Sequence, residues 1–204
     1  MLRAVVLLIG IASIGCASKR TVEGGFWFDE VTFTSAALGG AVTADDLRVI
    51  EATARAELSK AFEGFDVSIS DRRDVRYHVR VVQELLDRRM RRQAWIAGQS
   101  SAVRGFGGSG AVSFTYYASG ALVYAPPGTS RAGLIEAIGR GIGRGAAHEF
   151  AHQFLPSSPI HDSRDRASYE FYSASRPQQY FGEMRWDVAG PLLAAKYGHR
   201  LDTD

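Results

Sequence analysis

Length, composition and charge already exclude several classes of protein. With 204 residues, 46% of them apolar, the chain can bury one well-packed core but is too short for two full-sized domains. Its 24 basic and 22 acidic side chains leave a formal net charge of +2. A charge so nearly balanced provides no strong basic field. We therefore expect no nucleic-acid partner, and any ligand has to be recognised at a defined site.

The N-terminus has the layout of an export signal. Arg3 is followed by an apolar run over residues 4–15, which ends in small side chains. The run is shorter than the roughly 20 apolar residues that cross a hydrocarbon core of about 30 Å, so it indicates a targeting segment rather than a membrane helix. Residues 1–15 are predicted to be a signal peptide, and the protein is predicted to be exported.

Cys16, the only cysteine of the chain, directly follows this segment. The string Ser13-Ile14-Gly15-Cys16 resembles a bacterial lipobox, although Ser13 stands where leucine is usual. The resemblance implies an envelope lipoprotein that is attached to the membrane through a lipidated Cys16. Two alternatives remain open. Signal cleavage near Ala17 predicts a periplasmic or secreted protein, and retention of the segment predicts a buried free thiol.

Residues 16–25 are expected to form a polar tether and residues 26–204 a single domain. Aromatic and β-branched residues at 26–28 and 31–33 suit a short strand or an apolar anchor. Thr43, followed by Asp46, is typical of a helix start, and an apolar stripe at helical spacing continues to Phe62. Residues 65–69 and 75–81 alternate between apolar and polar side chains, which predicts two half-buried strands.

The second half of the chain predicts two more strands and two more helices. A glycine-rich loop precedes candidate strands at residues 112–117 and 121–124. Ser130 can cap a long helix that carries an apolar stripe to Phe154, and a last helix follows residue 188. Helices and strands do not alternate regularly, so the predicted fold class is α+β.

The long helix contains the pattern His148-Glu149-Phe150-Ala151-His152 near its C-terminal end. Residues four apart lie on one face of a helix, so both imidazoles can bind one zinc ion. Glu149 lies beside them and can act as a general base and then as an acid on a water that the metal activates. The alternative is a surface helix with two exposed histidines, but the apolar neighbours Ala147 and Phe150 argue against it.

A catalytic zinc ion takes three protein ligands. Pro156 and Pro159 end the helix and turn the chain, after which His161 and Asp162 follow within reach of the same metal. His161 is the preferred third ligand. Asp162 and Glu170 are alternatives.

This segment resembles the active site of metzincins, including matrixin-type and adamalysin-type peptidases. The chain departs from their long motif because it lacks the glycine and its third histidine, His161, comes three residues later. The resemblance implies a zincin-like catalytic domain with a mixed sheet, an active-site helix and a C-terminal helix. It also implies a methionine turn at Met184, which could equally be a core side chain, and a substrate-pairing edge strand, for which residues 111–117 are the candidate.

The leading hypothesis is therefore a monomeric zinc-dependent peptidase that hydrolyses peptide or protein substrates. His148, His152 and His161 would hold the metal and Glu149 would transfer protons. One alternative is an envelope lipoprotein that binds zinc without catalysis. Another is a hydrolase of the gluzincin type, in which Glu170 is the third ligand.

Three further features are interpreted as structural. The glycines at 139, 141, 143 and 145 do not match a phosphate-binding loop, so close packing of the helix is the preferred explanation. The arginines at 88, 89, 91 and 92 suit a solvated loop, or contact with an anionic envelope surface as the alternative. His78 alternates with apolar neighbours in a predicted strand and is expected to have a structural role.

Overall fold

The computed structural model describes residues 21–30, 32–87, 94–156 and 160–198, and it has the expected α+β class with a mixed sheet. The predicted signal peptide, Cys16 and the arginine cluster lie outside the described residues. In the described part of the chain, no helix is both long and apolar enough to span a bilayer.

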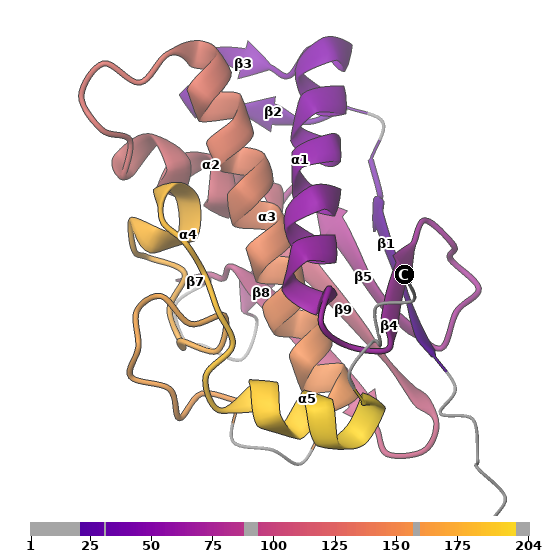
Figure 1. Ribbon diagram of the computed structural model, residues 1–204. Helices are drawn as coiled ribbons and strands as arrows, with labels where there is room; N and C mark the ends of the chain where they lie inside the picture. The colour runs from indigo at the N-terminus through magenta and orange to yellow at the C-terminus, as the bar shows by residue number, and fades with distance from the viewer. Residues whose placement is uncertain (1–20, 31, 88–93, 157–159, 199–204) are drawn as a thin grey trace, which may run out of the picture.

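A five-stranded sheet with the order β4-β1-β5-β9-β8 forms one layer of the molecule (Figure 1). The first four strands are parallel: β4 (Val67–Ser70), β1 (Val22–Phe28), β5 (Tyr77–Val82) and β9 (Gly107–Ser113). The fifth, β8 (Gly98–Val103), is antiparallel to β9 and lies at the edge. The predicted strands at 65–69 and 75–81 are confirmed, with β1 between them. Because β1 begins at Val22, residues 22–25 belong to the sheet, and the predicted extent of the tether to residue 25 was wrong.

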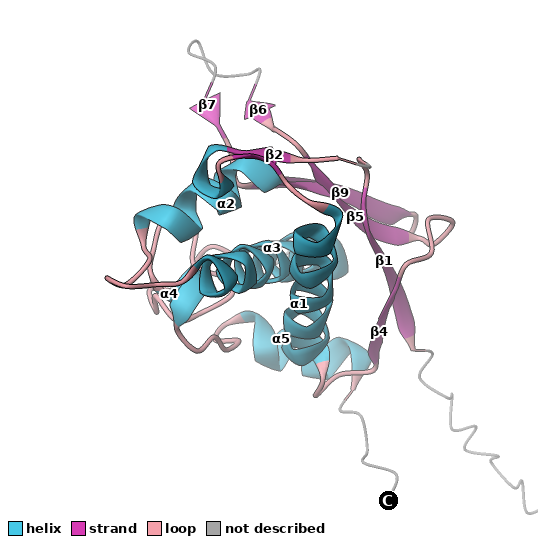
Figure 2. Cartoon of the chain, turned by 90° about the horizontal axis from the view of Figure 1, so that it is seen from above, coloured by secondary structure: helices cyan, strands magenta, loops and turns pink. Residues whose placement is uncertain are grey.

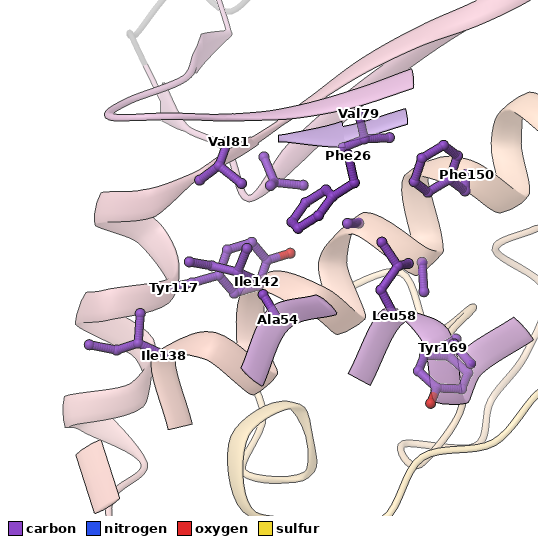
Figure 3. Close-up of a cluster of buried hydrophobic side chains, with 14 of the residues drawn as sticks. Phe26, Ala54, Leu58, Val79, Val81, Tyr117, Ile138, Ile142, Phe150 and Tyr169 are labelled. Carbon is purple, nitrogen blue, oxygen red and sulfur yellow. The ribbon is translucent and has the colours of Figure 1, made fainter. Parts of the chain in front are cut away.

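Alternating side chains of the sheet form one wall of the core. Phe26, Val79 and Val81 are fully buried and face the helices (Figure 3). Phe33 is buried next to Phe28 and Phe114 but lies outside any strand, so this residue serves as an apolar anchor.

Two long helices, α1 (Ala44–Phe62) and α3 (Arg131–Phe154), lie side by side on one face of this sheet (Figure 2). Both start where the sequence predicted. The Thr43 hydroxyl accepts the Asp46 amide in a capping box, and the Ser130 hydroxyl accepts the Gly133 amide.

The glycines of α3 allow this close approach, as predicted. A Cβ added at Gly139 would lie 2.7 Å from the Ile50 carbonyl oxygen, and one at Gly143 would meet the backbone of Ala54. Gly141 and Gly145 are covered instead by tyrosine rings. Both α1 and the tyrosines can therefore reach the backbone of α3, which offsets the poor helix propensity of glycine.

The prediction of strands at 112–117 and 121–124 was wrong beyond Ser113, because residues 114–123 form helix α2 (Phe114–Val123). The Ser113 hydroxyl caps it by accepting the Tyr116 amide. Its buried residues, Phe114, Tyr117, Ala118 and Ala121, follow helical spacing, and burial of that face overrides the β-propensity of the aromatic residues. The candidate edge strand at 111–117 was wrong as well, since β9 is an interior strand and its neighbour β8 lies at that edge of the sheet.

The remaining elements are short. β2 (Thr34–Ser35) pairs with β3 (Gly40–Ala41) around the turn η1 (Ala36–Leu38), and β6 (Leu86–Asp87) pairs with β7 (Ala94–Trp95). After α3 the chain is irregular except for α4 (Gln178–Phe181). It ends, within the described residues, with the predicted C-terminal helix, α5 (Ala189–Tyr197), which crosses the lower end of α3 (Figure 1).

Candidate metal centre

Three histidine rings converge at the C-terminal end of α3. His148 and His152 lie one turn apart on the helix, and His161 approaches from the following segment. The Nε2 atoms of His148 and His152 are 3.1 Å apart, and His161 Nε2 lies 3.0 Å from the first and 3.1 Å from the second. The structure thus brings together the three residues that the sequence predicted, close enough to bind one metal ion.

The spacing of these nitrogens fits a zinc ion. A triangle with these sides has a circumradius of about 1.8 Å, which is less than the usual Zn–N distance of about 2.0–2.1 Å, so one ion can contact all three corners. Burial, followed by the neighbouring histidines, lowers the pKa of His148 to about 3 and that of His152 to about 4. Neutral imidazoles keep the lone pairs that metals bind.

A backbone hydrogen bond orients the ring of His148. Its Nδ1–H donates to the carbonyl oxygen of Tyr169 at 2.7 Å, which directs the lone pair of Nε2 toward the cluster. Tyr169 is itself held by the chain around Arg185, because the Tyr169 amide donates to the Arg185 carbonyl at 3.0 Å. Met184, the residue before Arg185, packs against the hydrophobic core.

Glu149 lies beside the cluster in the same cavity. Its side chain is almost fully buried, and burial raises its pKa to about 8. The carboxylate lies against the backbone of Gly98, the first residue of β8, where an added Cβ would be 3.0 Å from its Cδ atom. Helix α3 and the edge strand thus hold the predicted proton-transfer group between them.

The cavity has a volume of about 570 Å³ and lies between β8, α3 and the segment after Tyr169. Besides the three histidines and Glu149, its lining includes aromatic and basic side chains, among them Tyr116, Tyr117, Phe171, Tyr172, Arg144 and Arg176. Unlike the metal ligands, these residues come from segments that carry no recognisable motif.

The two alternative ligands lie elsewhere. The carboxylate of Glu170 is fully buried and accepts hydrogen bonds from the backbone amides of residues 187–189, including Val188 at 2.8 Å, and from the Ser168 hydroxyl. It therefore caps the N-terminal end of α5, next to Ala189. Asp162 is exposed and is not part of the cluster. Within the described residues, the three histidines form the one group that could hold a metal ion.

Comparison with known proteins finds no relative. No protein-family model, no curated protein and no solved structure matches this chain.

Sequence reasoning missed the residues that fix the site to the sheet. The Gln153 amide accepts the His78 N–H at 3.1 Å and donates to the His78 carbonyl and to the Ser100 hydroxyl, both at 3.0 Å. One side chain thus ties α3 to β5 and β8, one residue beyond a metal ligand. His78 lies outside the cluster, with its ring against Trp27, and uses its backbone here. Neither contact has a sequence signal, because each joins residues far apart in the chain.

Proposed function

We propose that this protein is a zinc-dependent peptidase of the metzincin-like kind. The observation that carries the proposal is the convergence of three imidazole Nε2 atoms within 3.1 Å of one another beside the buried carboxylate of Glu149. Imidazole ligands suit zinc, and three protein ligands with an open position are typical of catalytic rather than structural zinc sites.

The roles of the residues follow from their positions. Zinc bound by the three histidines would supply a Lewis acid that activates water and polarises a peptide carbonyl. Glu149 lines the same cavity as the three histidines, so its carboxylate is placed to accept the proton of the attacking water and to pass it to the leaving amine. His148 is kept in one tautomer by the Tyr169 carbonyl, so its Nε2 stays available as a ligand.

The open edge of the sheet at β8 favours a peptide as the substrate. β8 is paired with β9 on one side and with no other strand among the described residues. Its first residue, Gly98, lies against Glu149 and lines the cavity. An extended peptide that added to this edge as a further strand would lie directly beside the proton-transfer group.

Several features support the metzincin-like assignment and the location. A mixed sheet, an active-site helix and a C-terminal helix make up the arrangement that the resemblance implies, and the chain has a mixed sheet with helices α3 and α5 in these places. A methionine turn at Met184 and a monomeric state remain part of the proposal. Export rests on the N-terminal apolar segment and Cys16, with an envelope lipoprotein as the first form and a periplasmic or secreted protein as the second.

The test is Glu149→Gln, with Glu136→Gln as the matched control. Glu136 lies on the same helix and is exposed, so the control makes the same chemical change away from the cavity. We expect Glu149→Gln to lower kcat/KM for peptide hydrolysis by about 10²- to 10⁴-fold while one zinc per chain remains bound. Full activity in Glu149→Gln would refute the mechanism. Stoichiometric zinc in the wild type without cleavage of a broad peptide library would instead support a zinc-binding protein without catalysis.

A further inference from the structure

A second buried charge lies in the wall of the same cavity. Arg176 is 1% exposed, and its guanidinium is held by backbone oxygens. Nη2 donates to the Ser168 carbonyl at 2.8 Å, and Nη1 donates to the carbonyls of Phe171 and Ser173. Nε is buried without a hydrogen-bond partner. The arginine thus fixes the wall of the cavity but keeps one donor unused.

Within the described part of the chain, no carboxylate forms an ion pair with Arg176. The other buried arginine of the cavity, Arg144, donates from Nε to Glu57 at 2.9 Å. Arg176 has no such ion pair among the described residues; its guanidinium meets only backbone carbonyl oxygens and the ring of Phe171, whose centroid lies 5.0 Å from the guanidinium carbon. Burial lowers the pKa of Arg176 only to about 10, so the side chain is positively charged at neutral pH.

A buried charge without a counter-charge is unfavourable, and a ligand that supplies the counter-charge is bound preferentially. The chain segment that carries Arg176 is also anchored to the neighbouring wall of the cavity. The Tyr116 hydroxyl lies 2.7 Å from the Ser175 hydroxyl, which joins the segment that carries Arg176 to α2. Glu149 is the only carboxylate among the residues that line this cavity, and it is assigned to proton transfer.

We propose that this cavity selects substrates that carry a carboxylate next to the scissile peptide bond, with Arg176 providing the counter-charge. This inference rests on the proposed peptidase function of the same site. The carboxylate has two possible sources, an acidic side chain and the C-terminal carboxylate of the peptide. The first describes an endopeptidase with acidic preference, and the second a carboxypeptidase.

Matched peptides test the proposal on the unaltered protein. Peptides cleaved from a defined library are resynthesised as Glu and Gln pairs at each position that flanks the scissile bond, and as pairs with a free or an amidated C-terminus. We expect kcat/KM to favour one charged member by about 10- to 100-fold. A preference for Glu identifies a side-chain carboxylate, and a preference for the free C-terminus identifies the terminal one. Equal kcat/KM in all pairs overturns the proposal.

A binding measurement separates this proposal from the peptidase function. Fluorescence anisotropy on the Glu149→Gln protein, with labelled Glu and Gln pairs and labelled free and amidated pairs made from the library peptides whether or not they are cleaved, reports the preference without turnover. If the wild type cleaves no peptide, the peptidase function fails, and a charged peptide that still binds about tenfold more tightly upholds the carboxylate site. Equal binding of both members overturns it.

Two variants assign the preference to Arg176. Arg176→Lys keeps the charge but not the planar donor set, whereas Arg176→Gln removes the charge. We expect the ratio of kcat/KM for the charged peptide to that for the neutral peptide to fall partly in Arg176→Lys and to about 1 in Arg176→Gln, at unchanged zinc content. Arg48→Gln is the control, because it removes one positive charge from an exposed arginine on α1 and so changes the net charge by the same amount. If Arg176→Gln does not fold, a ratio in Arg176→Lys equal to that of the wild type overturns the assignment.

Discussion

Gly98 gives the sharpest test of the geometry around Glu149. A Cβ added at this position would lie 3.0 Å from Cδ and 3.1 Å from Cγ of Glu149, and nearer still to Oε1. Ordinary carbon contacts are about 3.5–4.0 Å, so in Gly98→Ala the carboxylate has to move by at least about 0.5 Å. The strand cannot easily yield instead, because Gly98 is paired with Val112 of the interior strand β9.

The expected loss follows from this displacement. Misplacement of a reacting group by about 1 Å costs about 10²-fold in rate, so we expect Gly98→Ala to lower kcat/KM by about 10- to 100-fold, mainly through kcat. Zinc content should not change, since the three atoms nearest to the added Cβ all belong to Glu149. Gly64→Ala is the control, because nothing lies within 4 Å of a Cβ added there.

The assay compares steady-state hydrolysis of one fluorogenic peptide by the two glycine variants and the wild type, together with zinc content and Tm. In the Glu149→Gln background, Gly98→Ala should cause little further loss, because both changes act on the same group. Activity of Gly98→Ala within about twofold of the wild type, at full zinc content, would refute the placement of Glu149 against β8.

Three further predictions concern stability and the metal. Gly143→Ala should destabilise the fold by about 1–3 kcal/mol in urea unfolding, because its Cβ meets the α1 backbone. Gly133→Ala, on the same helix but without a close neighbour from α1, should stabilise the fold by about 0.5–1 kcal/mol. Equal effects of the two substitutions would contradict the close helix packing. Glu170→Gln should cost about 2–4 kcal/mol yet retain one zinc per chain, and loss of zinc from well-folded protein would restore Glu170 as a candidate ligand. Hydrogen bonds from Arg131 and then from Thr43 hold the pKa of Asp46 well below its usual range. The difference in unfolding free energy between the wild type and Asp46→Asn should therefore have its full size above about pH 4 and shrink as the pH falls below it. A difference that does not vary with pH would contradict this.

Local signals made part of this structure predictable. Thr43 and Ser130 start helices because their hydroxyls satisfy amides three residues ahead, and the four-residue spacing of His148 and His152 fixes their common face. The position of His161 was harder to predict, because it depends on the path of the chain after α3.

Other parts depend on contacts that the sequence does not reveal. Residues 114–117 have the composition of a strand, and only burial against α3 decides for a helix. β8 has no apolar alternation because it is an edge strand, and pairing with β9 defines it. Glu170 resembles a ligand in the sequence but meets the N-terminal end of a helix 17 residues or more away along the chain.

Two adjacent residues, Tyr169 and Glu170, connect the histidine cluster to the C-terminal helix. The carbonyl of the first orients His148, and the carboxylate of the second holds the start of α5. Shortening the chain before Asp187 would remove the three backbone amides that donate to the buried Glu170 carboxylate, directly beside the carbonyl that orients His148. Metal retention and protection of the α5 amides from hydrogen exchange should therefore rise and fall together, and a chelator should loosen a helix that does not contact the metal.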